Sequence, residues 1–153
     1  MPFGITGGWR RIRKETALAS NTARAEVHWR HDLVFQGNGL GRPPLTIDGD
    51  SAGGTSPVEL LLVACATCTG ADIVGILEKM RVRLEGLDID AVGTRREEHP
   101  RRLTAVHFRI SVRGAGSDEA KVRRAVDVSL EKYCSVMTSL APDIRVDYDV
   151  AIA

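Results

Sequence analysis

The sequence has little of what several protein classes need. Aromatic residues make up 5% of its 153 residues and the formal net charge is +1 at pH 7, so composition does not favour nucleic-acid binding, which uses a basic face with aromatic partners. Three cysteines do not make the disulfide framework of a small secreted protein. No apolar stretch of the signal-peptide type follows the first residue. These absences predict a cytoplasmic protein with reduced thiols that binds neither nucleic acid nor membrane.

One apolar run is long enough to raise the question of a membrane span. It covers residues 60–77, but Asp72 and several small polar or flexible residues interrupt it, namely Thr67, Thr69, Gly70 and Gly75. A core helix is therefore the better interpretation. The run is apolar on almost every side, which predicts a helix buried all round at the centre of the protein or of a dimer.

The start of this helix is signalled locally. Ser56 fits the N-cap position, Pro57 the first helical position and Glu59 the third, which together make a capping box. We expect the helix to run to about Arg81. A second helix is predicted to begin at Ser117–Glu119, with acidic residues in its first turn, and the helical region to end at Pro142.

Strands are predicted wherever short apolar segments alternate with polar residues, at 26–29, 33–35, 45–47, 86–95, 102–113 and 144–152. Residues 37–44 are predicted to form turns. The resulting order, βββ-α-ββ-α-β without an internal repeat, indicates an α+β fold. We expect a flexible basic arm over residues 1–24 and one domain over 25–153.

The cysteines are the most informative residues, and their pattern leaves several interpretations open. Cys65 and Cys68 form a C-x-x-C, but the motif lies more than two turns inside the helix, where the helix dipole does little to activate a thiol. A closed zinc site needs about four ligands and is disfavoured on an apolar helix, so we predict no metal and no cofactor. Cys65 alone is interpreted as a packed core residue.

Cys68 and Cys134 suggest a dithiol pair that the fold would assemble. A peroxide-reactive thiol must be a thiolate and needs a positively charged neighbour. The candidates are Arg30, Arg42 and Arg96, with Arg95 and Lys132 as further basic residues. At this point two separate buried cysteines remain the alternative, since a buried thiol usually behaves as a small hydrophobe. The four histidines are interpreted as surface or strand residues rather than ligands.

Two motifs resemble those of the OsmC/Ohr family of thiol-dependent hydroperoxide reductases. The helix start at residues 56–62, SPVELLL, followed by Cys68, is similar to the family's first-cysteine helix, and residues 131–136, EKYCSV, are similar to its second-cysteine motif. Residues 95–101, RREEHPR, and the run from Val27 to Gly49 resemble the YhfA-like branch. The resemblance covers about residues 25–152.

The resemblance implies an OsmC-like fold, in which antiparallel sheets wrap around long central helices in an intertwined homodimer. It implies Cys68 as the peroxidatic thiol and Cys134 as the resolving thiol. The implied reaction reduces an organic hydroperoxide to an alcohol in oxidative stress defence. The Cys68–Cys134 disulfide would then be reduced by a dithiol such as a lipoylated protein.

The sequence departs from the Ohr pattern at two places. Ohr members place a glutamate directly after the helix-opening proline, whereas Val58 stands there in this chain and the acid is Glu59. Glu59 is therefore a candidate partner for an arginine as well as a capping residue. The activating arginine of the Ohr turn has no match in the resembling region. A slow redox sensor, a small-molecule-binding protein or a dimer with inert thiols are the alternative functions.

Overall fold

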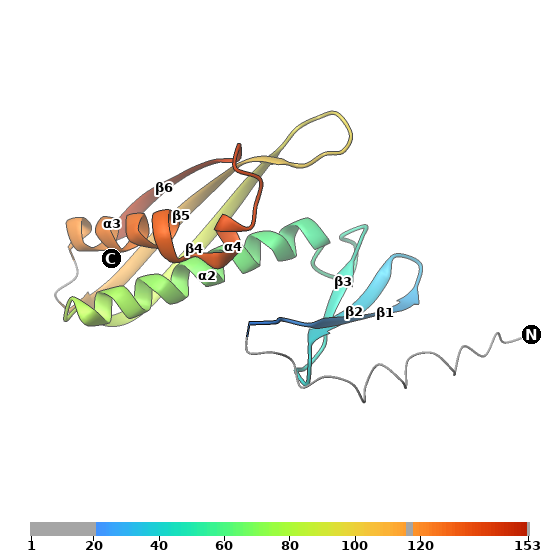
Figure 1. Cartoon of the computed structure of the whole chain (residues 1–153), viewed down its shortest axis with the longest axis horizontal. Helices are drawn as coiled ribbons and strands as arrows, with labels where there is room; N and C mark the ends of the chain where they lie inside the picture. The colour runs from blue at the N-terminus through green and yellow to red at the C-terminus, as the bar shows by residue number, and fades with distance from the viewer. Residues whose placement is uncertain (1–20, 116–117, 153) are drawn as a thin grey trace, which may run out of the picture. The chain divides into compact units, whose positions relative to one another are not determined.

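The computed structural model describes residues 21–115 and 118–152, so most of the basic arm predicted over residues 1–24 lies outside the described residues. The chain divides into two compact units, with the boundary between Thr55 and Ser56. This boundary falls inside the stretch that the sequence predicts as one domain. The elements follow the predicted order, βββ-α-ββ-α-β, with the second helical region in three pieces (Figure 1).

The first unit contains an antiparallel meander of three strands, β1 (Ala25–His31), β2 (Val34–Gly39) and β3 (Leu45–Asp48). The prediction of turns over residues 37–44 is wrong for its first part, because β2 continues through Gly37 to Gly39. The reason is steric. A Cβ on Gly37 would lie 3.0 Å from Cδ1 of Ile47, so glycine serves close packing within the sheet here rather than a turn.

The second unit is built on a three-stranded sheet in the order β4-β5-β6. β4 (Arg83–Arg95) and β5 (Leu103–Ala115) form a long antiparallel hairpin, whereas β6 (Arg145–Ile152) pairs with β5 in parallel. The expectation of purely antiparallel sheets is therefore wrong for this last pair. A helical crossover separates β5 from β6, and such a connection returns the chain in the parallel direction.

Two helices cover one face of this sheet, α2 (Pro57–Lys79) and α3 (Glu119–Val128) (Figure 1). After α3 the chain continues as a π-helix, η1 (Ser129–Tyr133), and a single turn, α4 (Ser135–Thr138). The core lies between helices and sheet. It is formed by alternate residues of β5 and the inner faces of the helices, including Val106, Phe108, Ile110, Val112, Ile73, Leu77, Val122, Ala125 and Val126.

Helix α2 is not buried all round in this chain, contrary to the prediction. Leu61 is 36% and Val63 is 53% exposed, whereas Cys65, Ile73 and Leu77 are fully buried. By length and composition α2 is also able to span a membrane, yet its inner face packs on β4 as a core helix does. The position of α2 at the centre of a dimer stays a prediction.

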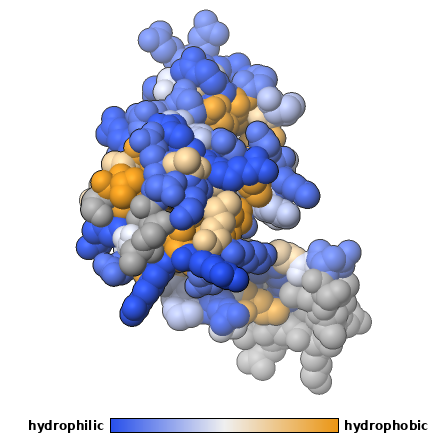
Figure 2. Space-filling view, turned by 90° about the vertical axis from the view of Figure 1, so that its left-hand side faces the viewer, coloured by the Kyte–Doolittle hydropathy of each residue, from blue (hydrophilic) through white to orange (hydrophobic). Residues whose placement is uncertain are grey.

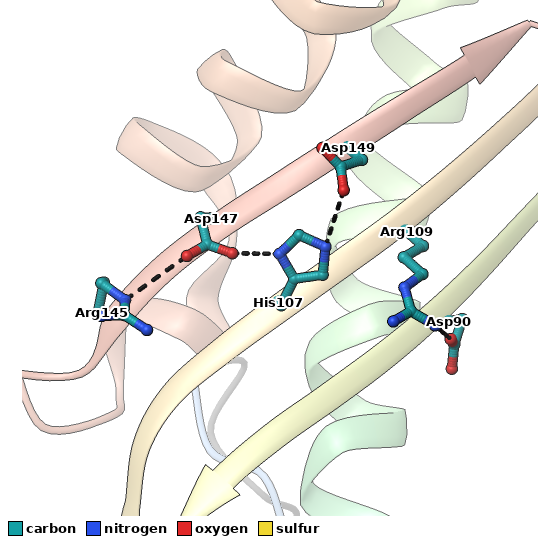
Figure 3. A network of polar contacts seen from close by, with 6 residues as sticks. All are labelled: Asp90, His107, Arg109, Arg145, Asp147 and Asp149. Carbon is teal, nitrogen blue, oxygen red and sulfur yellow. Dashed lines mark hydrogen bonds and ion pairs between the residues drawn. The ribbon is translucent and has the colours of Figure 1, made fainter.

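The opposite face of the β4-β5-β6 sheet is polar and needs no covering layer. The ring of His107 lies between the carboxylates of Asp147 and Asp149, and Arg109 pairs with Asp90 at 3.3 Å (Figure 3). The face drawn in Figure 2 is likewise mostly hydrophilic, with apolar side chains exposed in separate groups. Apolar side chains of the second unit that are exposed to solvent are found on α2, at Leu61 and Val63.

Candidate functional site

The candidate site begins with the local signals that place α2. The Ser56 side chain accepts a hydrogen bond from the backbone N–H of Glu59, and the Glu59 carboxylate accepts bonds from the backbone N–H and the hydroxyl of Ser56. This confirms the predicted capping box. The Ser56 hydroxyl, and then its backbone N–H, lower the pKa of Glu59. Glu59 thus caps the helix roughly 13 Å along its axis from Cys68.

Cys68 lies in the middle of α2, one residue before the fully buried Thr69 and four residues before Asp72. Residues four apart in an α-helix lie above one another on the same face. The Cys68 thiol and the Asp72 carboxyl therefore project in a common direction. Cys65, three residues before Cys68, is fully buried in the core, as predicted.

Cys134 lies at a break in the second helical region. The π-helix η1 ends at Tyr133, Cys134 has extended backbone angles (φ −69°, ψ 95°), and α4 begins at Ser135. The Cys134 backbone N–H donates to the Ser129 carbonyl at 2.8 Å, which closes the wide turn. Single π-turns within helices are frequent at functional sites. Here the wide turn and the extended residue direct a fully buried Cys134 side chain towards α2.

The fold brings Cys68 and Cys134 together, although 65 residues separate them. One ligand atom from each of Cys68, Asp72 and Cys134 lies within 4.8 Å of the other two. The three cysteines are free thiols. The juxtaposition has the proximity that a dithiol pair needs, and it disfavours the alternative of two unrelated buried cysteines. The catalytic roles of the two thiols stay predictions.

Two hydroxyl groups hold the members of this cluster in place. The Thr69 hydroxyl donates to Sγ of Cys134 at 3.5 Å, and the Ser129 hydroxyl donates to Oδ2 of Asp72 at 2.8 Å. Both Thr69 and Ser129 are fully buried. The first bond links α2 to the second thiol, and the second bond links η1 back to α2. The cluster is thus cross-connected from both helical segments.

The electrostatics of the site work against ionisation of the first thiol. Burial is the largest cause that raises the pKa of Cys68, and the neighbouring Cys134 and the charge of Asp72 raise it further. The backbone N–H of Val136, at the start of α4, donates to the thiol and acts in the opposite direction. Burial, followed by Cys134 and Cys68, also raises the pKa of Cys65.

The predicted activating arginines are described by the contacts that each makes within its own unit. Arg96 donates from Nε to the carbonyl of Pro100 in the β4–β5 loop, so its hydrogen bond holds that loop. Arg30 and Arg42 belong to the first unit, where Arg30 donates two hydrogen bonds to the side chain of Gln36. A role for either in activating Cys68 stays a prediction. Lys132 lies over the ring of Tyr133, 5.3 Å from its centroid.

Asp72 is the site residue that sequence reasoning missed. Its spacing of four residues from Cys68 was the available signal, because that spacing places both side chains on one helix face. Ser129 and Thr69 carried no such signal, since their partners are 57 and 65 residues away in the sequence.

Comparisons with known proteins agree with this architecture. The family model described as OsmC-like protein matches residues 48–149. Protein YhfA of Escherichia coli strain K12 is 37% identical over 133 residues, which cover 85% of this chain and 99% of YhfA.

Two solved structures show the same fold. A hypothetical protein from Aquifex aeolicus VF5 is 27% identical with a TM-score of 0.75, over 86% of this chain and 98% of that one. The organic hydroperoxide resistance protein OhrB of Bacillus subtilis is 15% identical with a TM-score of 0.61, over 87% and 100%.

Proposed function

The chain belongs to the OsmC-like protein family, and from this premise we propose that it is a thiol-dependent peroxidase that reduces organic hydroperoxides to alcohols. The observation that carries the proposal is the cluster in which Cys68 on α2 and Cys134 between η1 and α4 lie within 4.8 Å of each other in one unit. The fold is shared with a protein of organic hydroperoxide resistance, which supports the substrate class.

In the proposed reaction the Cys68 thiolate attacks the distal oxygen of the hydroperoxide. The O–O bond breaks, the alkoxide takes up a proton and leaves as the alcohol, and Cys68 becomes a sulfenic acid. The Cys134 thiol then attacks the Cys68 sulfur, the disulfide forms and water leaves. A dithiol reductant returns both thiols by exchange and is itself oxidised to a disulfide. Such a cycle requires a reducing compartment, so a cytoplasmic location is part of the proposal.

The structural asymmetry of the two thiols supports this order of events. Cys68 is partly exposed and receives a hydrogen bond from the Val136 N–H, whereas Cys134 is fully buried and lies next to it. The thiol that meets the substrate needs access, and the resolving thiol needs only to reach the first sulfur. This ordering agrees with the roles that the family resemblance implies.

A second candidate function is a redox sensor that reacts slowly. Burial and the Asp72 carboxylate both oppose a thiolate at Cys68, and no cation is among the groups of the second unit that most affect its pKa. Since the thiolate is the reactive form, this environment favours slow oxidation unless an arginine reaches the site in the assembled protein. The rate of reaction decides between the two candidates.

The test is peptide mapping by mass spectrometry after brief exposure of the reduced protein to stoichiometric cumene hydroperoxide or hydrogen peroxide. We expect a Cys68–Cys134 disulfide, formed faster with the organic peroxide and faster than free cysteine oxidises in the same buffer. Cys68→Ser should abolish turnover, Cys134→Ser should stop at the sulfenic acid, and Cys65→Ala should behave as wild type. Turnover by Cys68→Ser would remove the mechanism, and oxidation no faster than that of free cysteine would favour the sensor.

A homodimer completes the proposal. Leu61 and Val63, in the first turns of α2, expose apolar side chains in the single chain, and Cys68 lies on the same helix. A second copy of the chain would bury this surface and add an apolar wall near the thiols. Such a wall would suit the organic part of a hydroperoxide.

A further inference from the structure

We propose that the reduced protein binds a thiophilic divalent cation, of which Zn²⁺ is the type, through Cys68, Cys134 and Asp72. The proposed peroxidase reaction assigns no role to Asp72. The inference goes beyond the proposed function and does not rest on it, because binding needs only the reduced cluster and no peroxide.

The ligand set is suitable for zinc. Zn²⁺ binds thiolate sulfur at about 2.3 Å and carboxylate oxygen at about 2.0–2.2 Å, usually in tetrahedral geometry. Neighbouring ligand atoms in such a site lie about 3.4–3.8 Å apart. The two sulfurs and the carboxylate oxygen already lie within 4.8 Å of one another, so the three atoms need to approach one another by no more than about 1.4 Å. The fourth position remains for water or for a substrate atom.

Two hydroxyl groups around the cluster donate hydrogen bonds to its members, as groups around metal ligands commonly do. Carboxylate ligands in metal sites are themselves hydrogen-bonded, and this fixes the direction of the lone pairs that face the metal. Here the Ser129 hydroxyl donates to one oxygen of Asp72 at 2.8 Å, which leaves the other oxygen for a cation. The Thr69 hydroxyl donates to Sγ of Cys134 at 3.5 Å and positions that sulfur in the same way.

The donor types of the cluster suit a thiophilic cation. Two sulfurs and a carboxylate oxygen lie together in a partly buried place. A divalent cation would displace the two thiol protons. Binding is written as two thiols plus Zn²⁺ giving the zinc dithiolate plus two protons. In a Cys68–Cys134 disulfide neither sulfur is a thiolate, so oxidation and metal binding would exclude each other.

The test is a titration of full-length reduced protein with Zn²⁺ in competition with a chromophoric chelator, in a non-chelating phosphine reductant. We expect one ion per chain, and with Co²⁺ as a probe a thiolate-to-metal charge-transfer band. Cys68→Ser and Cys134→Ser should each weaken Zn²⁺ binding by more than about 100-fold, and Asp72→Asn by about tenfold or more. Cys65→Ala is the matched control and should bind as wild type.

One variant and one form of the wild type keep the test decisive where a cysteine substitution harms folding. Asp72→Asn keeps the size of the side chain and its bond from Ser129, and wild-type protein oxidised to the disulfide has an unchanged sequence. Asp72→Asn protein that binds Zn²⁺ as tightly as wild type would overturn the three-ligand site. Binding that survives oxidation, or that is absent from reduced wild type, would overturn it as well. Zinc binding by a protein that shows no peroxidase activity would leave the inference standing and remove only the proposed function.

Discussion

Thr69 donates a hydrogen bond from its hydroxyl to Sγ of Cys134, across 3.5 Å and 65 residues of sequence. Thr69 is the residue that follows Cys68 on α2, so one helical turn carries both the first thiol and the group that positions the second. The two sulfurs therefore have a fixed relation before any chemistry begins. A peroxidase benefits from such preorganisation in the resolving step, where one sulfur must reach the other.

Thr69→Val should separate the resolving step from the first oxidation. Valine has nearly the shape of threonine but lacks the donor, so we expect a loss of about 1 kcal/mol in the free energy of unfolding, slower disulfide closure and accumulation of Cys68 sulfenic acid. Trapping of the sulfenic acid with dimedone, followed by mass spectrometry, measures this. Thr94→Val, at an exposed position of β4, is the control. Equal trapping in the two variants would show that the Thr69 hydroxyl has no part in closure.

Asp72→Asn should make Cys68 react faster with peroxide in the absence of metal. The Asp72 charge raises the pKa of Cys68, so its removal lowers that pKa and increases the thiolate fraction near neutral pH. Because burial is the larger cause, we expect an acceleration of less than about tenfold. The pH dependence of alkylation by iodoacetamide measures the change. Glu78→Gln, at an exposed position of the same helix, should leave the profile unchanged.

The pairing of β6 with β5 should weaken as pH rises past the pKa of His107. Hydrogen bonding to Asp147 is the largest cause that raises this pKa above 6.5, and the charge of Asp149 adds to it, whereas partial burial lowers it (Figure 3). The protonated ring therefore stabilises the folded state fully below pH 6.5, and this contribution is lost as pH rises through the higher folded-state pKa. Two arginines also face the carboxylates beside His107. Arg145 pairs with Asp147 at 3.5 Å, and Arg109 lines the same surface hollow as Asp149.

The measurement is the urea midpoint of wild type and of His107→Gln between about pH 5.5 and about pH 9. We expect the urea midpoint of wild type to exceed that of the variant most at the acid end of this range. The difference between the two midpoints should shrink towards the alkaline end. His99→Gln, in the exposed β4–β5 loop, is the control and should give a difference that does not vary in this way. A His107→Gln difference that stays constant over the range would refute the assignment.

Features with local causes were predictable from the sequence, and features that depend on distant partners were less so. The start of α2 was predicted to the residue because Ser56 and Glu59 signal it by themselves. The pairing of Cys68 with Cys134 was reached through the family resemblance, since spacing alone left other interpretations open. The parallel addition of β6 and the hydrogen bond from Ser129 to Asp72 emerged only in the structure, because each depends on contacts across the fold.

The exposed side of α2 gives the last prediction, on assembly. Val63 on α2 is 53% exposed in the single chain, and Val92 on β4 is 42% exposed, on the polar face of the sheet. If a second copy covers α2, Val63→Lys would place a charge in an apolar interface and should convert the dimer to a monomer. Val92→Lys makes the same change at a similarly exposed valine outside that interface and should remain dimeric. Sedimentation velocity of the two variants and wild type distinguishes these states. A Val63→Lys protein that sediments as wild type does would place the interface elsewhere, and a dimer disrupted only by Val92→Lys would move it to the sheet.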